Sequence, residues 1–293
     1  MFEIEKLSPD FGVRVIGVDL DQPLGAEAGE ELQGLLKKHR LLLFRQGPLD
    51  DAQHLRLMSA MGRVIVEEPG GSSFFAYVST NPKDYVGTTG RLRWHSDGQF
   101  TTTGALQAIS LYCMEMERCE PTLFSDQVRA AKVLPADLRR RVKDLDVLQC
   151  LDLSSRIELY RCRLSKKGAD VPDSQWPRHP HPILGPHPFT GEEMLNVSQM
   201  FSSHVVGFTD EESDQLFDQL EPHQYDPAHV YAHEWQVNDL VIWDNVALQH
   251  SRDVLSAPSG RTLRRVSINP LSNAEMLKGI APDPSLQIGK GGW

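Results

Sequence analysis

The alternation of apolar and polar residues along the chain predicts many short strands, with a few amphipathic helices between them. β-Branched and apolar runs bounded by Gly or Pro are typical of strands, whereas apolar residues three and four positions apart indicate a helix. Strands are expected at residues 13–20, 41–44, 74–79, 92–97, 106–113, 122–126, 240–243 and 266–268. Helices are expected at residues 28–40, 50–61, 128–142 and 210–220, the second ending at Gly62 and the last capped by Thr209.

This order of elements predicts a mainly β fold with helical decoration. Helices do not alternate regularly with strands, and the chain has no GxGxxG turn or phosphate-binding loop, so a doubly wound parallel sheet fits poorly. A jelly-roll barrel fits the pattern better. Residues 165–190, which are rich in Pro, Lys, Gly and His, are expected to form a long loop, and the segment from Leu271 carries little signal.

Composition narrows the class of protein. The length of 293 residues favours one or two domains. The net charge of -10 argues against general binding to the phosphate backbones of nucleic acids. No run of 18 apolar residues and no secretory signal is evident, and a cytoplasmic location is expected. The four cysteines lack CxxC spacing and are expected to be free thiols rather than a structural zinc site.

Two segments carry residues that could bind a metal ion. His95 and Asp97 are two positions apart, which on an extended strand places both side chains on one face. An apolar strand at 240–243 is followed by a turn and then by His250. Two histidines and one carboxylate form the facial triad of non-haem Fe(II) oxygenases. The plainer interpretation, a chance HxD triplet and a surface histidine after a turn, stays open from these residues alone.

A third segment is rich in arginine. On an extended strand Arg261 and Arg265 share one face, and Arg264 points to the other. Clustered arginines are usually solvated, but a buried guanidinium requires an anion and pairs well with a carboxylate. The segment therefore predicts either a charged surface or a carboxylate-binding site.

These three segments, in this order, resemble the taurine/2,4-dichlorophenoxyacetate dioxygenase family of Fe(II)- and 2-oxoglutarate-dependent oxygenases. The motifs that carry the resemblance are Trp94-His95-Ser96-Asp97 with Phe100, Trp243-Asp244-Asn245 with His250, and Arg261 with Arg265. Further similarity lies at residues 11–20, 43–45, 61–64, 187–191 and 195–197, so the resemblance covers roughly residues 8–270.

The resemblance implies a double-stranded β-helix, a jelly roll of the cupin type, in a single oxygenase domain over residues 1–293. Its core would be about 8–270, with a C-terminal tail at 271–293. It implies that His95, Asp97 and His250 bind Fe(II), and that Arg261 and Thr122 hold the distal carboxylate of 2-oxoglutarate. Arg265, Tyr77, Asn81 and Asn196 would lie near the primary substrate. Where the family usually has Gly-Gly-Asp-Thr, this chain has Cys119-Glu120-Pro121-Thr122.

The implied reaction oxidises an unactivated C–H bond of a small molecule, consumes 2-oxoglutarate and O₂, and releases succinate and CO₂. Arg265, with Arg91 and Arg93, favours an anionic substrate. Hydroxylation, hydroxylation followed by C–S or C–O cleavage, and desaturation are all compatible with these residues, as is a homo-oligomer. The carboxylate at Asp97 argues against halogenation. Two alternatives stay open: a non-catalytic ligand sensor, and a Zn-dependent hydrolase using the same three ligands.

The remaining histidines support plainer interpretations. His179, His181 and His187 each precede Pro, which favours extended backbone. A rigid loop at the edge of the active site is expected there, with a second metal site as the alternative. Three more histidines are expected to lie at the surface or to cap helices: His223, His229 and His233.

Overall fold

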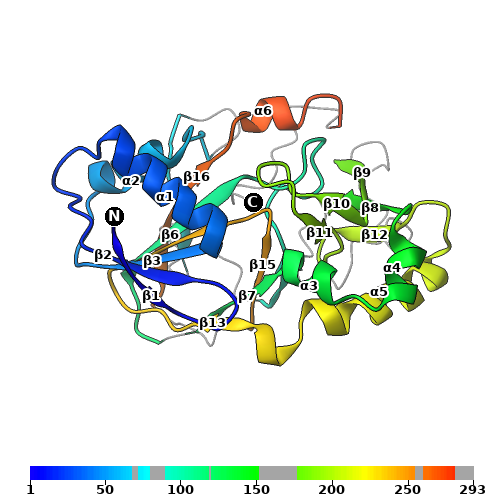
Figure 1. The fold of residues 1–293 in the computed structure, drawn as a ribbon. Helices are drawn as coiled ribbons and strands as arrows, with labels where there is room; N and C mark the ends of the chain where they lie inside the picture. The colour runs from blue at the N-terminus through cyan, green and yellow to red at the C-terminus, as the bar shows by residue number, and fades with distance from the viewer. Residues whose placement is uncertain (68–71, 80–89, 119, 152–176, 255–259, 281–293) are drawn as a thin grey trace.

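The computed structural model describes residues 1–67, 72–79, 90–118, 120–151, 177–254 and 260–280 (Figure 1). In this part of the chain the fold is mostly β with added helices, as the sequence predicts. The helices lie at its edges and on one sheet face. No helix among the described residues is long and apolar enough to cross a membrane. Cys113 and Cys150 are buried, and the other two cysteines lie outside the described residues.

The largest sheet has seven strands in the order β1-β2-β3-β14-β6-β16-β4. Neighbouring strands are antiparallel except β2 and β3, which are parallel. The central strands are apolar and buried along most of their length, which is why the sequence patterns at 41–44 and 240–243 identify them. The strands are β1 Glu3–Lys6, β2 Val13–Ile16, β3 Leu41–Arg45, β4 Ala76–Ser79, β6 Ala108–Glu115, β14 Asp239–Asp244 and β16 Thr262–Ile268.

A second, four-stranded antiparallel sheet has the order β13-β7-β15-β5 and packs against the first. Phe124 and Leu248 from this sheet share one apolar core with Leu43, Ile109 and Val241 from the seven-stranded sheet. The strands are β5 Leu92–His95, β7 Thr122–Asp126, β13 Tyr231–His233 and β15 Leu248–Arg252. This sheet carries the histidines of the predicted metal site.

Two helices, α1 Ala26–His39 and α2 Asp51–Met61, cover the outer face of the large sheet (Figure 1). Their buried leucines and methionines pack on Leu42 and Val266. A capping box between Asp50 and Gln53 begins α2, and its carboxylate satisfies a backbone N–H that the first turn would otherwise leave unpaired.

The other end of the molecule holds two small sheets and three helices around a separate apolar cluster (Figure 1). The small sheets pair β12-β8-β9 and β10-β11. These elements are β8 Asp146–Cys150, β9 Arg178–Pro182, β10 Leu184–Pro186, β11 Glu193–Leu195, β12 Ser202–Val205, α3 Gln127–Val133, α4 Ala136–Val142 and α5 Asp210–Gln224.

Three local predictions are corrected by the structure. The helix expected at 128–142 is two helices, because Pro135 has an extended ψ of 143° and a ring that cannot continue α3. Residues 178–186 form two strands rather than a loop, since the prolines there hold their neighbours extended. The segment after Leu271 contains a short helix, α6 Asn273–Met276, which begins with a capping box at Ser272.

Candidate active site

The two histidines of the predicted metal site lie opposite each other on paired strands. His95 is the last residue of β5, and His250 is the central residue of β15. These strands pair in antiparallel register with His250 facing His95, and the imidazole centroids are 4.2 Å apart. Asp97 lies two residues beyond the end of β5, in a turn rather than on the strand that the sequence analysis expected. Strand β15, from a distant part of the chain, thus brings His250 next to His95 and Asp97.

The distances between these side chains suit a single bound ion. His95 Nε2 is 3.2 Å from Asp97 Oδ1, and His250 Nε2 is 4.0 Å from the same oxygen. One ligand atom from each residue lies within 4.8 Å of the others. Ligand atoms about 2.1 Å from a common metal lie at most about 4.2 Å apart, and nearer 3 Å when adjacent. Small adjustments would therefore close the three groups around an ion.

The protonation states also suit metal binding. His95 Nδ1 lies 2.6 Å from the Arg93 carbonyl oxygen, which can only accept, so Nδ1 carries a hydrogen and Nε2 is the nitrogen that faces Asp97. His250 lies beside the rings of Trp243 and Phe124 at 5.2 and 6.4 Å. Burial, helped by His95, lowers the pKa of His250 to about 3, so this imidazole is neutral near pH 7.

Asp97 is ionised and is held on both sides. Burial alone would raise the pKa of this carboxyl, but Arg265 and His95 overcome that effect and hold the pKa well below its usual range. Arg265 Nη1 donates to Asp97 Oδ2 at 2.7 Å. Because the guanidinium takes Oδ2, Oδ1 is left facing the two histidines.

Asn245 fixes the backbone of Asp97. Its side-chain Oδ1 accepts from the Asp97 N–H at 3.1 Å, and its Nδ2 donates to the carbonyls of Asp97 and Leu106, each at 3.0 Å. Asn245 is fully buried, so these bonds have no competition from water. The amide therefore sets the turn that positions the carboxylate.

His187 performs a similar task for the strand that carries His250. Backbone N–H groups of Phe189 and Thr190 donate to His187 Nδ1, both at 3.2 Å, which leaves the proton on Nε2. That nitrogen lies 3.1 Å from Oδ1 of Asp244, and the same oxygen accepts from two backbone N–H groups of the following turn. His187 is thus a buried residue that supports the turn before His250.

Arg261 and Thr122 are both buried and share one neighbour. Trp235 donates from Nε1 to Thr122 Oγ1 at 2.9 Å, and the Arg261 guanidinium lies 5.9 Å from the centre of the Trp235 indole. An indole N–H can only donate, so the Thr122 hydroxyl keeps its own hydrogen for another acceptor. The structure therefore places a cation and a hydroxyl donor in one region beside the metal-site sheet.

The interpretation of the arginine segment as a solvated surface is wrong. Arg261, Arg264 and Arg265 are each at most 3% exposed. Arg264 points to the helix side, where Nε donates to His54 Nδ1 at 3.2 Å. Arg265 points to the metal site, as the alternation along a strand predicts.

Arg265 has a second carboxyl neighbour that the sequence analysis missed. Its Nε lies 3.2 Å from Glu67 Oε2 and 3.2 Å from Ser267 Oγ. Glu67 is 1% exposed. Burial raises the pKa of Glu67 above its ordinary value, and the adjacent Arg265 acts against that shift. Nothing in the local sequence around Glu67 indicates this contact, since it depends on the path of the chain after α2.

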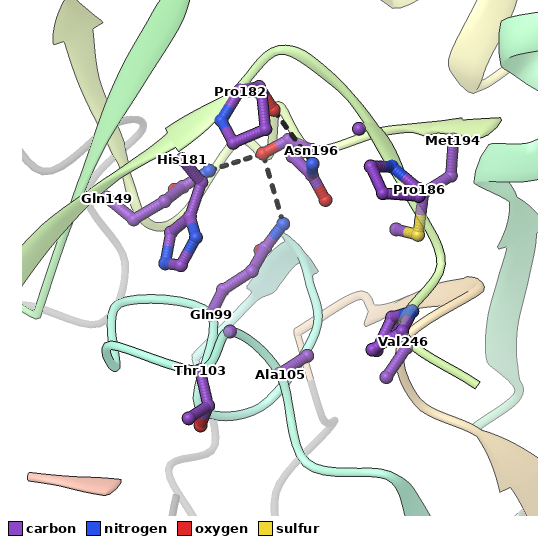
Figure 2. Close-up of a pocket in the computed structure, with 13 residues that line it drawn as sticks. Gln99, Thr103, Ala105, Gln149, His181, Pro182, Pro186, Met194, Asn196 and Val246 are labelled. Atoms are coloured by element: carbon purple, nitrogen blue, oxygen red, sulfur yellow. Dashed lines mark hydrogen bonds between the residues drawn. The ribbon is translucent and has the colours of Figure 1, made fainter. Parts of the chain in front are cut away.

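The residues expected near the substrate are not gathered in one place. Tyr77 is half-buried on β4, opposite Arg264, and Asn81 lies outside the described residues. Asn196 lines a cavity of about 140 Å³, in which its carbonyl accepts from Gln99 and Gln149 (Figure 2). None of the three candidate metal ligands lines this cavity.

One of the plainer histidine predictions is wrong. His233 is not at the surface, being 1% exposed with Nε2 at 3.2 Å from Asp239 Oδ2. His181 is partly buried and contacts the Thr101 carbonyl oxygen through Nε2 at 2.8 Å. Among the described residues, the group able to hold a metal is the cluster of His95 with Asp97 and His250.

Comparison with known proteins agrees with this geometry. The sequence matches the model of the taurine catabolism dioxygenase TauD, TfdA family over residues 3–267. The chain is 26% identical over 280 residues to the alpha-ketoglutarate-dependent 2,4-dichlorophenoxyacetate dioxygenase of Cupriavidus pinatubonensis, covering 89% of this chain and 95% of that one. It is 28% identical over 191 residues to pentalenolactone F synthase of Streptomyces arenae, covering 62% of each.

Solved structures show the same fold. A taurine dioxygenase from Burkholderia xenovorans superposes with a TM-score of 0.73 at 22% identity, covering 91% of this chain and 89% of that one. AAD-2, solved in complex with Mn(II) and N-oxalylglycine, has a TM-score of 0.73 at 22% identity, covering 92% and 97%.

The chain belongs to the TauD/TfdA dioxygenase family. The enzyme class that the sequence resemblance implied, an Fe(II)- and 2-oxoglutarate-dependent dioxygenase acting on a small molecule, is confirmed.

Proposed function

We propose that His95, Asp97 and His250 hold the Fe(II) with which this enzyme oxidises a C–H bond of a small molecule. The observation that supports the assignment is the convergence of two imidazoles and one ionised carboxylate, with ligand atoms within 4.8 Å of one another. When bound, the iron supplies the activation of O₂ that is coupled to conversion of 2-oxoglutarate into succinate and CO₂.

The chain's own residues keep the site in a binding-ready form. The Arg93 carbonyl fixes the His95 tautomer, and Arg265 fixes which oxygen of Asp97 faces the histidines. Asn245 holds the turn between the HxD residues and the next strand. Such supporting contacts orient ligands and raise metal affinity.

Arg261 and Thr122 are the proposed partners of the distal carboxylate of 2-oxoglutarate. A buried guanidinium pairs well with a carboxylate, and the Thr122 hydroxyl keeps a hydrogen to donate beside it. Tyr77 and Asn196 are proposed to border the primary substrate. Arg265, which donates to Asp97, is proposed to border it as well.

We further propose that the mostly β fold is a double-stranded β-helix in one domain. The two mostly antiparallel sheets that share one apolar core support this architecture. The free thiol of Cys150 suits the proposed location in the reducing cytoplasm.

The metal assignment is tested by replacement of single ligands. His95→Ala and Asp97→Ala are expected to abolish iron-dependent release of succinate from 2-oxoglutarate, because each leaves two ligands. Turnover at the wild-type rate in either variant would contradict the assignment. A ligand sensor would bind 2-oxoglutarate without forming succinate, and a zinc hydrolase would keep its activity without oxygen.

The co-substrate assignment has its own test. Arg261→Ala is expected to raise the KM for 2-oxoglutarate by a factor of about 10 to 100 while iron affinity changes little, since a charge-assisted pair contributes about 1.5–3 kcal/mol. Equal losses of 2-oxoglutarate and iron affinity would show that Arg261 is structural.

A further inference from the structure

A buried carboxyl group lies beside the arginine that contacts the iron ligand. The chain between α2 and β4 runs along the end of β16, where Ile65 N–H donates to the Ser267 carbonyl at 3.1 Å. This pairing carries Glu67 to the side of Arg265, and the Glu67 N–H donates to the Ser73 carbonyl at 2.9 Å. Glu67 is therefore held in place by backbone contacts on both sides, away from water.

The guanidinium of Arg265 is shared between two carboxyl groups. Nη1 pairs with Asp97 Oδ2 at 2.7 Å, and Nε pairs with Glu67 Oε2 at 3.2 Å. A substrate anion that approached Arg265 would meet the Glu67 carboxyl at its Nε edge. Displacing Glu67 would leave a buried carboxylate without its cation, which is strongly unfavourable.

The formal charges of the proposed ligands, the bound co-substrate, the two arginines and Glu67 balance one another. Fe(II), Arg261 and Arg265 contribute four positive charges, while Asp97, Glu67 and the two carboxylates of 2-oxoglutarate contribute four negative charges. A monoanionic substrate would add a buried charge that nothing here neutralises. Without Glu67 the same site would carry one positive charge and would suit such an anion.

We propose that Glu67 is a specificity-determining residue, and that it makes the enzyme select a substrate that is uncharged at the end that enters the iron site. This inference rests on the proposed function of the site. It replaces the sequence-based reason for an anionic substrate, because the positive charge of Arg265 is already matched by carboxyl groups of the chain.

The test compares acids with their amides, which have nearly the same shape but differ by one charge. Full-length wild-type protein and Glu67→Gln are loaded with Mn(II) and N-oxalylglycine, a pair that does not turn over. Calorimetric titrations at about pH 8 then measure the binding of 2,4-dichlorophenoxyacetate and its amide, and of benzenesulfonate and benzenesulfonamide. The alkaline pH favours the ionised form of the Glu67 carboxyl, whose pKa burial raises.

The wild type is expected to bind the amides more tightly than the acids. Glu67→Gln is expected to bind the acids about 10- to 30-fold more tightly than the wild type does, because the variant removes one negative charge near the bound anion. Amide affinity should stay within about twofold. Ser267→Ala, which removes another neighbour of Arg265 without changing charge, should show no gain for acids.

Several results would overturn the inference. They are a wild type that prefers the acids, a Glu67→Gln protein that binds acids no better than the wild type or not at all, and equal gains for acids and amides. Glu67→Met, which also removes the charge, replaces Glu67→Gln if that variant does not fold. Failure of wild-type protein with Mn(II) to bind N-oxalylglycine would instead overturn the proposed function, and the inference with it.

Discussion

Replacing Asn245 with Ala should weaken both the fold and the metal site. The side-chain amide makes three hydrogen bonds at 3.0–3.1 Å, and the variant leaves the Asp97 N–H and the Leu106 carbonyl without this partner. A buried backbone group that loses its partner costs about 1–3 kcal/mol. The free energy of unfolding should therefore fall by roughly 2–5 kcal/mol. Because the Asp97 turn loosens, Mn(II) affinity should fall by about 10- to 100-fold.

Asn269→Ala is the matched control. Asn269 is also buried, accepts from the Gln107 N–H at 3.2 Å and donates to the Leu271 carbonyl at 2.8 Å, so these side-chain hydrogen bonds go to residues other than the candidate ligands. Urea unfolding should show comparable losses of stability for both variants, whereas calorimetric titration with Mn(II) should separate them. If Asn245→Ala binds Mn(II) as tightly as Asn269→Ala does, Asn245 does not position Asp97.

Two further predictions concern the helix side of the large sheet. Burial and the adjacent Arg264 lower the pKa of His54 to about 3. Below pH 6.5 the unfolded chain therefore binds a proton that the folded protein excludes. The free energy of unfolding should consequently fall by roughly 2–3 kcal/mol between about pH 7 and 4.5. Urea unfolding of His54→Gln should show a smaller loss over that range, and an unchanged pH dependence would contradict this. Gly29→Ala should destabilise the protein by about 1–3 kcal/mol, because its Cβ would lie 2.6 Å from the Ala60 carbonyl oxygen. Gly34→Ala, with open space around it in the same helix, should stabilise by about 0.5–1 kcal/mol, and thermal melts giving both variants the same sign would refute the packing argument.

The strands and helices with strong local patterns could be predicted from the sequence. The apolar run at 41–44 and the capping residues Asp50 and Thr209 act within a few residues, and the structure has strands and helix starts at those places. The break at Pro135 was also visible in the sequence, but the amphipathic pattern across 128–142 concealed it.

The candidate site could be predicted in composition but not in geometry. The expectation that an extended strand aligns His95 with Asp97 is wrong, because β5 ends at His95 and the carboxylate is placed by a turn. That turn depends on Asn245, 148 residues away along the chain. The contact of Glu67 with Arg265 is of the same kind, since it arises only when distant segments pack together.

The position of Glu67 assigns substrate selection and iron binding to different segments of the chain. It lies on a connection between α2 and β4, whereas the proposed iron ligands lie on or just after paired strands of the other sheet. Replacing one side chain on that connection would alter substrate specificity without changing the strands that carry the proposed iron ligands. Proteins that evolve from this fold would therefore change their substrate range through this connection alone, while the iron-binding residues stay the same.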